Sequence, residues 1–218
     1  MSVSDLLVVV ATPLEAERLP ALRDARVVVS GIGAVNAALA TQAAILESRP
    51  RLAVSVGIAG AYPWGGASIG EVIVASRCVY AGLGAEDDEE FLNLELLGFP
   101  LLETRGSRVF NTIPTAQEHL EFARVTHAKI GEILTLETVT GSERSLERLQ
   151  RLHPNAIAEA MEGAGVAHAA ALHGIPALEV RGISNAVEAG RHRESWRIGV
   201  ALDALHDALE TGWMRLLE

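Results

Sequence analysis

Cysteine and aromatic residues are scarce in this 218-residue sequence. Cys78 is the only cysteine, so no disulfide bond can form within the chain, which is typical of proteins from a reducing cytoplasm. Aromatic residues make up 4% of the chain, whereas hydrophobic residues make up 49%. We therefore expect a cytoplasmic protein whose core consists of alanine, valine, leucine and isoleucine, and the length suits one α/β domain over residues 1–218.

Long apolar runs and an excess of positive charge are also missing. No apolar stretch approaches the ~20 residues that a membrane span needs, and residues 1–5 lack the basic start of a signal peptide. Lysine and arginine number 18 against 28 aspartate and glutamate residues, which gives a formal charge of −10. Such a charge disfavours nucleic acid or an anionic membrane as the partner. We expect neither of them to bind.

The common cofactor and nucleophile motifs do not occur either. No cluster of cysteine and histidine has the spacing of metal ligands, and there is no phosphate-binding loop of the G-x-x-x-x-G-K-[ST] type. The turn Gly31–Gly33 lacks the third glycine of a dinucleotide motif, because position 36 is asparagine. A G-x-S-x-G nucleophile elbow is absent as well. His168 and His173 lie on different faces of a predicted helix, so we expect them to be structural.

Strand-like and helix-like segments alternate along the chain, which predicts an α/β fold. Continuous apolar runs are typical of strands that are buried on both faces. The expected strands are Leu6–Ala11, Val27–Ser30, Leu52–Val56, Glu71–Tyr80, Ile133–Leu136 and Ala177–Ile183. The expected helices are Asn36–Glu47, Ser142–Leu152, Glu162–Leu172 and Glu194–Leu217. Five acidic residues within Gly82–Glu90 predict a solvated loop.

Glycine turns or polar side chains follow several of these strands. Gly31–Gly33 and Gly57–Gly60 follow two of them, Glu162 follows an apolar segment, and Asn185 follows another. Ligands of α/β sheets bind at the carboxyl ends of strands. A carboxylate and an amide in one crevice suit a sugar hydroxyl and a heterocyclic base. Taken singly, each glycine turn is better explained by a tight connection between strand and helix.

Five segments resemble the nucleoside phosphorylase and nucleosidase superfamily, and among its members the methylthioadenosine/adenosylhomocysteine nucleosidases in particular. They are Ala11–Glu15, Ser30–Ala38, Gly57–Gly60, Met161–Glu162 and Val180–Ser184. They occur in the family's order over almost the whole chain. The resemblance implies a three-layer α/β/α fold around a mixed, partly barrel-like sheet, and it implies no metal ion or organic cofactor.

Two departures from the superfamily pattern narrow the expected activity. Phosphorylases carry an arginine-bearing glycine loop after the first strand, but this chain has Thr12–Glu15 there. A carboxylate repels phosphate and can activate water, so hydrolysis is favoured. Adenine-specific nucleosidases end the later strand with Ser-Asp, whereas this chain has Ser184 and Asn185. An asparagine NH2 group can serve N7 and O6 of a 6-oxopurine but cannot act as a general acid.

The segments Arg181–Val187 and Arg191–Ile198 are similar to the futalosine hydrolases. This similarity implies cleavage of futalosine to hypoxanthine and dehypoxanthine futalosine in menaquinone biosynthesis. The alternatives are a 6-oxopurine nucleoside phosphorylase, a methylthioadenosine/adenosylhomocysteine nucleosidase, and a binding or storage relative without activity. Asn185 disfavours the adenine-type nucleosidase, and the binding protein would not need both Glu15 and Glu162.

The resemblance also implies roles for individual residues. Glu15 would activate water, Glu162 would bind the ribose hydroxyls, and Asn185 would bind the base, all as catalytic groups. From the residues alone, a carboxylate at a helix N-terminus is the better explanation of Glu15 and an equally good one of Glu162, and Asn185 can be a turn residue. The implied substrate-binding residues are Val139, Thr140, Met161, Arg191, Arg193 and Trp196, of which the two arginines would hold the benzoate carboxylate. Family members pair, so we expect a homodimer or a higher homo-oligomer.

Overall fold

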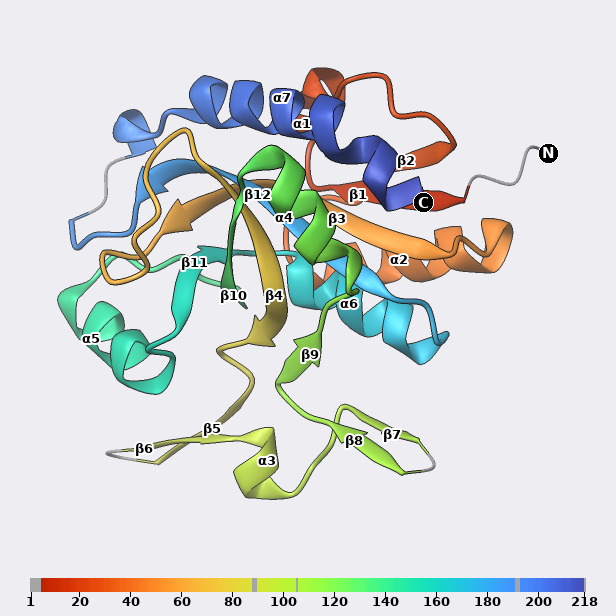
Figure 1. Ribbon diagram of the computed structural model, residues 1–218. Coiled ribbons are helices and arrows are strands. Elements are labelled where there is room, and N and C mark those ends of the chain that lie inside the picture. The colour runs from red at the N-terminus through yellow and green to blue at the C-terminus, as the bar shows by residue number, and fades with distance from the viewer. Residues whose placement is uncertain (1–4, 88–89, 105, 191–192, 218) are drawn as a thin grey trace.

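A mixed sheet of eight strands forms the centre of the computed structural model, which describes residues 5–87, 90–104, 106–190 and 193–217 (Figure 1). The strands are β1 (Leu6–Val10), β2 (Ala25–Val29), β3 (Leu52–Ala61), β4 (Val72–Tyr80), β9 (Thr112–Pro114), β10 (Lys129–Thr135), β11 (Ala156–Ala160) and β12 (Ala177–Ala186). β1 is buried along its whole length, as expected for an apolar strand covered on both faces.

Five of these strands close into a barrel. The order β11-β10-β4-β12-β3 is completed by an antiparallel pairing of β11 with β3, in which Ala158 faces Ala61 and Glu159 faces Gly60. β1 and β2 extend the sheet from β3 as parallel strands. The predicted mixed, partly barrel-like sheet is therefore confirmed.

Helices cover both sides of the sheet and complete the three layers. The helices are α1 (Pro13–Arg18), α2 (Ala34–Ser48), α4 (Glu118–Thr126), α5 (Glu143–Leu152), α6 (Gly163–Leu172) and α7 (Ile198–Leu217). α2 and α6 pack together over one apolar cluster, and α4 and α7 pack over the other. α6 is buried almost all round, which explains why its sequence is so rich in alanine and glycine. Among the described residues, none of the helices is long and apolar enough to cross a membrane.

Several predicted boundaries are wrong in an informative way. β3 and β12 continue past their predicted ends, so Gly57–Gly60 and Asn185 lie inside strands rather than in turns. Barrel closure supplies the hydrogen-bonding partners that keep both strands extended. The predicted helix Glu194–Leu217 is divided, because Arg193–Ser195 form a short 3₁₀ turn and α7 begins only at Ile198.

The predicted acidic loop at Gly82–Glu90 is instead part of a projecting hairpin. It contains β5 (Gly84–Asp87) and β6 (Glu90–Asn93), which pair antiparallel. α3 (Leu94–Leu97), β7 (Leu102–Thr104) and β8 (Ser107–Val109) follow it. Figure 1 shows these elements extending away from the barrel. Their strands are three or four residues long and carry few apolar residues, so the sequence contains no strong period to predict them.

Candidate active site

A pocket of about 280 Å³ lies where β1, β3, β11 and β12 end. The expected site residues Glu15, Val139, Met161, Glu162, Asn185, Arg193 and Trp196 all line it. They come from segments up to 180 residues apart, and the carboxyl ends of the parallel strands bring them to one edge of the sheet, as is usual in α/β folds. The wall is largely apolar, with a few converging polar groups, which is the usual character of a small-molecule site.

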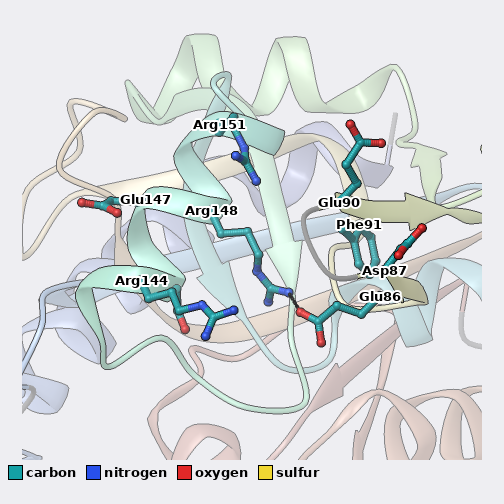
Figure 2. Close-up of a pocket in the computed structure, with 9 residues that line it drawn as sticks. Glu86, Asp87, Glu90, Phe91, Arg144, Glu147, Arg148 and Arg151 are labelled. Atoms are coloured by element: carbon teal, nitrogen blue, oxygen red, sulfur yellow. Dashed lines mark hydrogen bonds and ion pairs between the residues drawn. The ribbon is translucent and has the colours of Figure 1, made fainter.

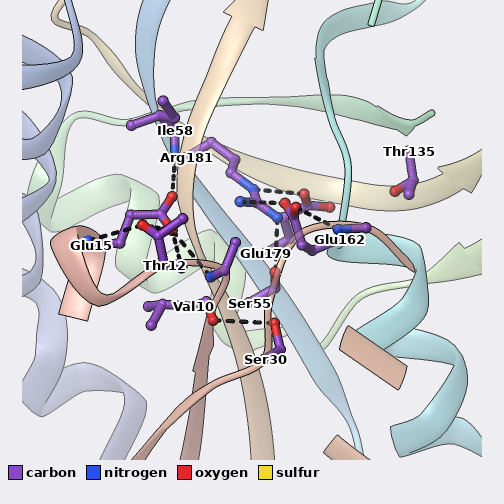
Figure 3. Close-up of polar contacts among 12 residues, drawn as sticks. Val10, Thr12, Glu15, Ser30, Ser55, Ile58, Thr135, Glu162, Glu179 and Arg181 are labelled. Carbon is purple, nitrogen blue, oxygen red and sulfur yellow. Dashed lines mark hydrogen bonds and ion pairs between the residues drawn. The ribbon is translucent and has the colours of Figure 1, made fainter. Parts of the chain in front are cut away.

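Glu15 is held in one position by donors from the residues that follow β1 and from β3. Its Oε2 atom accepts hydrogen bonds from Ala11 N (3.1 Å), Thr12 N (2.9 Å) and Thr12 Oγ1 (3.0 Å). Its Oε1 atom accepts from Ile58 N (3.2 Å) on β3. Thr12 and Glu15 also form a capping box at the start of α1, a pairing that satisfies helix donors. Glu15 is thus both a helix-capping residue and a buried, oriented carboxylate in the pocket (Figure 3).

Glu162 is the N-cap residue of α6, and it contacts the turn that follows β2 and the strand β12. Its Oε1 atom accepts a hydrogen bond from Gly33 N (3.2 Å), and its Oε2 atom lies 3.3 Å from an Arg181 guanidinium nitrogen. Gly33 has φ 97°, a conformation that favours glycine. The Gly31–Gly33 turn therefore aims a backbone donor at Glu162. From the sequence, glycines here are expected to let a ligand approach the backbone, whereas the structure shows that Gly33 orients Glu162.

Arg181 lies at the centre of the carboxylates, and the sequence predictions do not include it. Its Nε donates to Glu179 Oε1 (2.9 Å) and its Nη2 donates to Ser55 Oγ (2.9 Å). Burial acts to lower the pKa of Arg181, but the charges of Glu179, Glu162 and Glu15 outweigh it, so the pKa is raised. The pKa of Glu179 is also raised, because burial disfavours the charged form of a carboxyl group. Glu179 and Arg181 are two positions apart in a strand, so their side chains lie on the same face. This spacing is the sequence signal from which a buried ion pair could have been predicted.

Two glycines make room for this cluster. A Cβ atom at Gly57 would lie 2.4 Å from Arg181 Nη1 and 2.6 Å from Glu15 Oε1. A Cβ atom at Gly163 would lie 1.9 Å from Glu179 Oε2. Real Cβ atoms do not approach other atoms so closely, so only glycine fits with the carboxylates and guanidinium in place. Arg181 and Glu15 therefore both reach β3 at Gly57.

Asn185 is buried in β12 opposite Gly60 of β3. Its Oδ1 atom accepts a hydrogen bond from Ser184 Oγ (2.8 Å), and its Nδ2 atom donates to Ala186 O (2.9 Å). An amide nitrogen carries two donor hydrogens. The contacts fix which end of the amide is the donor, and Asn185 lies in the wall of the pocket.

The other predicted residues divide into three groups. Val139, Met161, Arg193 and Trp196 line the pocket. Thr140 is buried behind the wall, where its backbone N and its hydroxyl both donate to Glu159, a pocket residue that the sequence predictions omit. Arg191 lies outside the described residues.

A second hollow, of about 580 Å³, lies between α5 and the β5–β6 hairpin (Figure 2). Arg144, Arg148 and Arg151 of α5 face Glu86 and other acidic side chains of the hairpin. Arg148 pairs with Glu86 at 3.1 Å, and solvent reaches both side chains, which are 36% and 72% exposed. Exposed ion pairs of this kind are weak. The hollow is larger than the pocket but lacks its buried, oriented carboxylates, so it is the weaker candidate.

Among the residues that the structure describes, no group of three or more histidine, cysteine, aspartate or glutamate side chains is arranged to hold a metal ion.

Comparisons with known proteins agree with the fold and show the family of the chain. A family model described as the phosphorylase superfamily matches residues 6–208. The futalosine hydrolase of Streptomyces coelicolor is 42% identical over 185 residues, which cover 83% of this chain and 74% of that protein. The futalosine hydrolase of Acidothermus cellulolyticus is 39% identical over 187 residues, which cover 84% of this chain and 73% of that protein.

Solved structures of similar fold include a 5′-methylthioadenosine/S-adenosylhomocysteine nucleosidase from Colwellia psychrerythraea in complex with adenine. It matches with a TM-score of 0.79 and 19% identity, and the match covers 97% of this chain and 95% of that chain. At this level of identity the match supports the fold alone.

Proposed function

We propose, because this chain belongs to the phosphorylase superfamily and to the futalosine hydrolases within it, that it hydrolyses the N-ribosidic bond of futalosine. The products are hypoxanthine and dehypoxanthine futalosine, and the reaction belongs to menaquinone biosynthesis. Futalosine is proposed as the substrate because the relatives are futalosine hydrolases. Hydrolysis is proposed as the reaction because Glu15, after the end of β1, is an oriented carboxylate that can activate water.

In this proposal Glu15 activates the attacking water. The water oxygen bonds to C1′ of the ribose, the C1′–N9 bond breaks with its electron pair leaving on the base, and Glu15 accepts a water proton. The four hydrogen bonds that Glu15 accepts support this role, because they hold the carboxylate in place before the substrate binds. An oriented base needs little rearrangement during the reaction.

Glu162 binds the sugar in the same proposal. One oxygen is held by Gly33 N and the other by Arg181, so the carboxylate is oriented toward the pocket that it lines. It accepts hydrogen bonds from the 2′- and 3′-hydroxyls and stabilises the positive charge that develops on the ribose ring. Met161 packs under the sugar.

Asn185 binds the departing base. One hydrogen of its NH2 group is donated to Ala186 O, and the other is shared between N7 and O6 of a 6-oxopurine, where it stabilises the negative charge that leaves with the base. An amide cannot donate a proton as an acid does. The proposal therefore favours hypoxanthine, which is a better leaving group than adenine.

Arg193 and Trp196 form the end of the pocket that would hold the benzoate of futalosine. Arg193 is exposed and lines the pocket beside Trp196. A guanidinium can bind a carboxylate through two parallel hydrogen bonds, and an aromatic ring can pack against the benzoate ring.

A 6-oxopurine nucleoside phosphorylase remains the second candidate, because Asn185 suits its base equally well. Arg181 is the arginine next to Glu15, but it is already bound to Glu162 and Glu179, which disfavours phosphate there. Incubation of the protein with futalosine, inosine and methylthioadenosine, each with and without phosphate, tests these alternatives. We expect futalosine to be cleaved equally in both conditions. Detection of a sugar 1-phosphate by phosphorus NMR would refute hydrolysis.

A homodimer or higher homo-oligomer in the cytoplasm completes the proposal. α2 carries Val35, Leu39 and Leu46 with about two thirds of each side chain exposed (67%, 66% and 65%). Contiguous exposed apolar side chains on a helix are typical of protein interfaces. Light scattering coupled to size-exclusion chromatography should give a mass of at least twice 23.1 kDa, and Leu39→Glu should reduce it. A monomeric wild-type protein would contradict the proposal.

A further inference from the structure

Glu159 is a buried carboxylate in the wall of the pocket that none of the proposed roles uses. It is 2% exposed and lines the pocket together with Asn185 and Gly60. Its donors include Thr140 N (2.9 Å) on Oε1, and Tyr62 Oη (2.9 Å) and Thr140 Oγ1 on Oε2. A carboxylate in an apolar wall costs free energy to bury unless it is paired or hydrogen-bonded. Holding it there with dedicated donors therefore suggests a function for the charge.

The position of Glu159 relative to Asn185 follows from the barrel. Glu159 on β11 and Asn185 on β12 both face Gly60, on opposite edges of β3. Adjacent strands are about 4.8 Å apart, so the two backbones lie roughly 10 Å from each other. Both side chains line one pocket, and Gly60 adds no side chain between them. A planar base can therefore lie between the amide and the carboxylate.

Glu159 also determines the hydrogen-bonding character of this wall. Behind this wall, Glu159 Oε1 accepts a hydrogen bond from the backbone N–H of Thr140. The group that this side presents is a carboxylate, which is an acceptor. N1 of a 6-oxopurine carries a hydrogen and donates, whereas N1 of a 6-aminopurine is an acceptor with a lone pair.

We propose that Glu159 is a specificity-determining residue that accepts a hydrogen bond from N1–H of a 6-oxopurine, while Asn185 binds the N7 and O6 side of the same base. A 6-aminopurine would place its N1 lone pair against the carboxylate, and this repulsion excludes it. The inference rests on the proposed function and extends it, because it assigns base selection to two residues rather than to Asn185 alone.

The test compares the wild-type protein with Glu159→Met and Glu159→Gln on futalosine and on its 6-amino analogue. Glu159→Met removes both the acceptor and the negative charge from the wall. We expect kcat/KM for futalosine to fall on the order of 10- to 100-fold, the scale of a hydrogen bond to a charged group. Activity on the 6-amino analogue should be retained or improved. Glu159→Gln keeps the shape and loses the charge, so the oxo-to-amino ratio should fall by about threefold or more.

Tyr62→Phe is the matched control. It removes one of the donors to Glu159 but leaves the carboxylate in the wall, so the oxo-to-amino ratio should stay within about threefold of the wild-type ratio. If the Glu159 variants instead lose activity on both substrates by the same factor, Glu159 serves only the fold, and the proposal is overturned.

Binding of free bases to the wild-type protein provides a measurement that needs no variant. Isothermal titration should show tighter binding of hypoxanthine than of adenine or 1-methylhypoxanthine, which both lack the N1–H donor. Equal affinity for the three bases would overturn the proposal even if the variants fail to fold. A wild-type protein that cleaves no nucleoside would refute the proposed function, whereas the base titration would still decide the role of Glu159.

Discussion

At the scale of single residues, the pocket is defined by how its charged groups are held. Glu15, Glu159 and Glu162 each accept hydrogen bonds from backbone N–H groups, and Arg181 is bound between Glu162 and Glu179. Buried charges that are paired and hydrogen-bonded are costly to disturb, because removal of one partner leaves the other uncompensated. Substitutions in this cluster should therefore affect activity and stability together, so each one needs a matched control.

Glu15→Gln tests the role of the water-activating carboxylate. Glutamine keeps the size of the side chain and can still cap α1, but it cannot accept the water proton. We expect kcat to fall by about 10²- to 10⁴-fold with little change in KM, measured by hypoxanthine release. Glu17→Gln on the same helix changes an exposed carboxylate and should leave kcat unaffected. Near-normal turnover by Glu15→Gln would assign water activation to another group.

Gly57→Ala tests whether Arg181 and Glu15 need the space that a side chain at position 57 would occupy. The new Cβ atom would overlap Arg181 Nη1 and Glu15 Oε1, so both groups must move. We expect a loss of stability of about 1–3 kcal/mol, the usual cost of overpacking, and a drop in kcat. Gly199→Ala is the control, because no atom lies within 4 Å of its Cβ position. Denaturant unfolding that gives equal stabilities for Gly57→Ala and the wild type would contradict this packing.

At the scale of elements, the pocket depends on where strands stop and helices begin. Glu15 lies in the first turn of α1, where it forms a capping box with Thr12, and Glu162 is the N-cap residue of α6. The 3₁₀ turn Arg193–Ser195 connects the end of β12 to α7 and brings Arg193 and Trp196 to the pocket. Trp196 N donates to Arg193 O, and Arg197 N donates to Ser184 O. This connection is therefore tied to the strand that carries Asn185.

Arg193→Met tests the proposed benzoate contact at this turn. If the guanidinium binds the carboxylate of futalosine, its loss should weaken futalosine binding by about 10- to 100-fold. Inosine has no carboxylate, so its cleavage should not change. Arg197→Met is the control, since Arg197 is exposed and is not among the residues that line the pocket. An equal loss on both substrates would show that Arg193 maintains the turn and does not bind the carboxylate.

At the scale of the whole molecule, burial makes stability depend on pH. Burial lowers the pKa of His153 and His168 from the usual 6.5. The unfolded chain binds protons at these histidines at a higher pH than the folded chain does. The free energy of unfolding should therefore be highest above pH 6.5 and should fall as the pH drops through 6.5 toward the lowered folded-state values.

Urea unfolding at a series of pH values between about 8 and 5 measures this dependence directly. We expect the double variant His153→Gln, His168→Gln to lose less stability than the wild type over that range, because glutamine does not titrate. Parallel curves for the two proteins would contradict the assignment to these histidines.

Local sequence patterns are enough to predict most strands of the central sheet and several of its helices, although β9, α1 and α4 are not among the predicted elements. Long apolar runs such as Leu6–Val10 and a continuous alanine-rich segment such as Gly163–Leu172 have enough local signal to identify a buried strand and a buried helix. The short projecting strands β5 to β8 have no such period, and the ends of β3 and β12 depend on partners far along the chain. Their boundaries could not be predicted for that reason.

The site divides in the same way. The motifs around Glu15, Glu162 and Asn185 are local and sufficed to identify a family, but the functions of Arg181 and Glu159 depend on contacts across the barrel. Only the pairing of β11 and β12 with opposite edges of β3 places Glu159 and Asn185 on the two sides of Gly60. Strand register is set by packing and hydrogen bonds over the whole barrel, so tertiary structure alone decides which buried charges meet in the pocket.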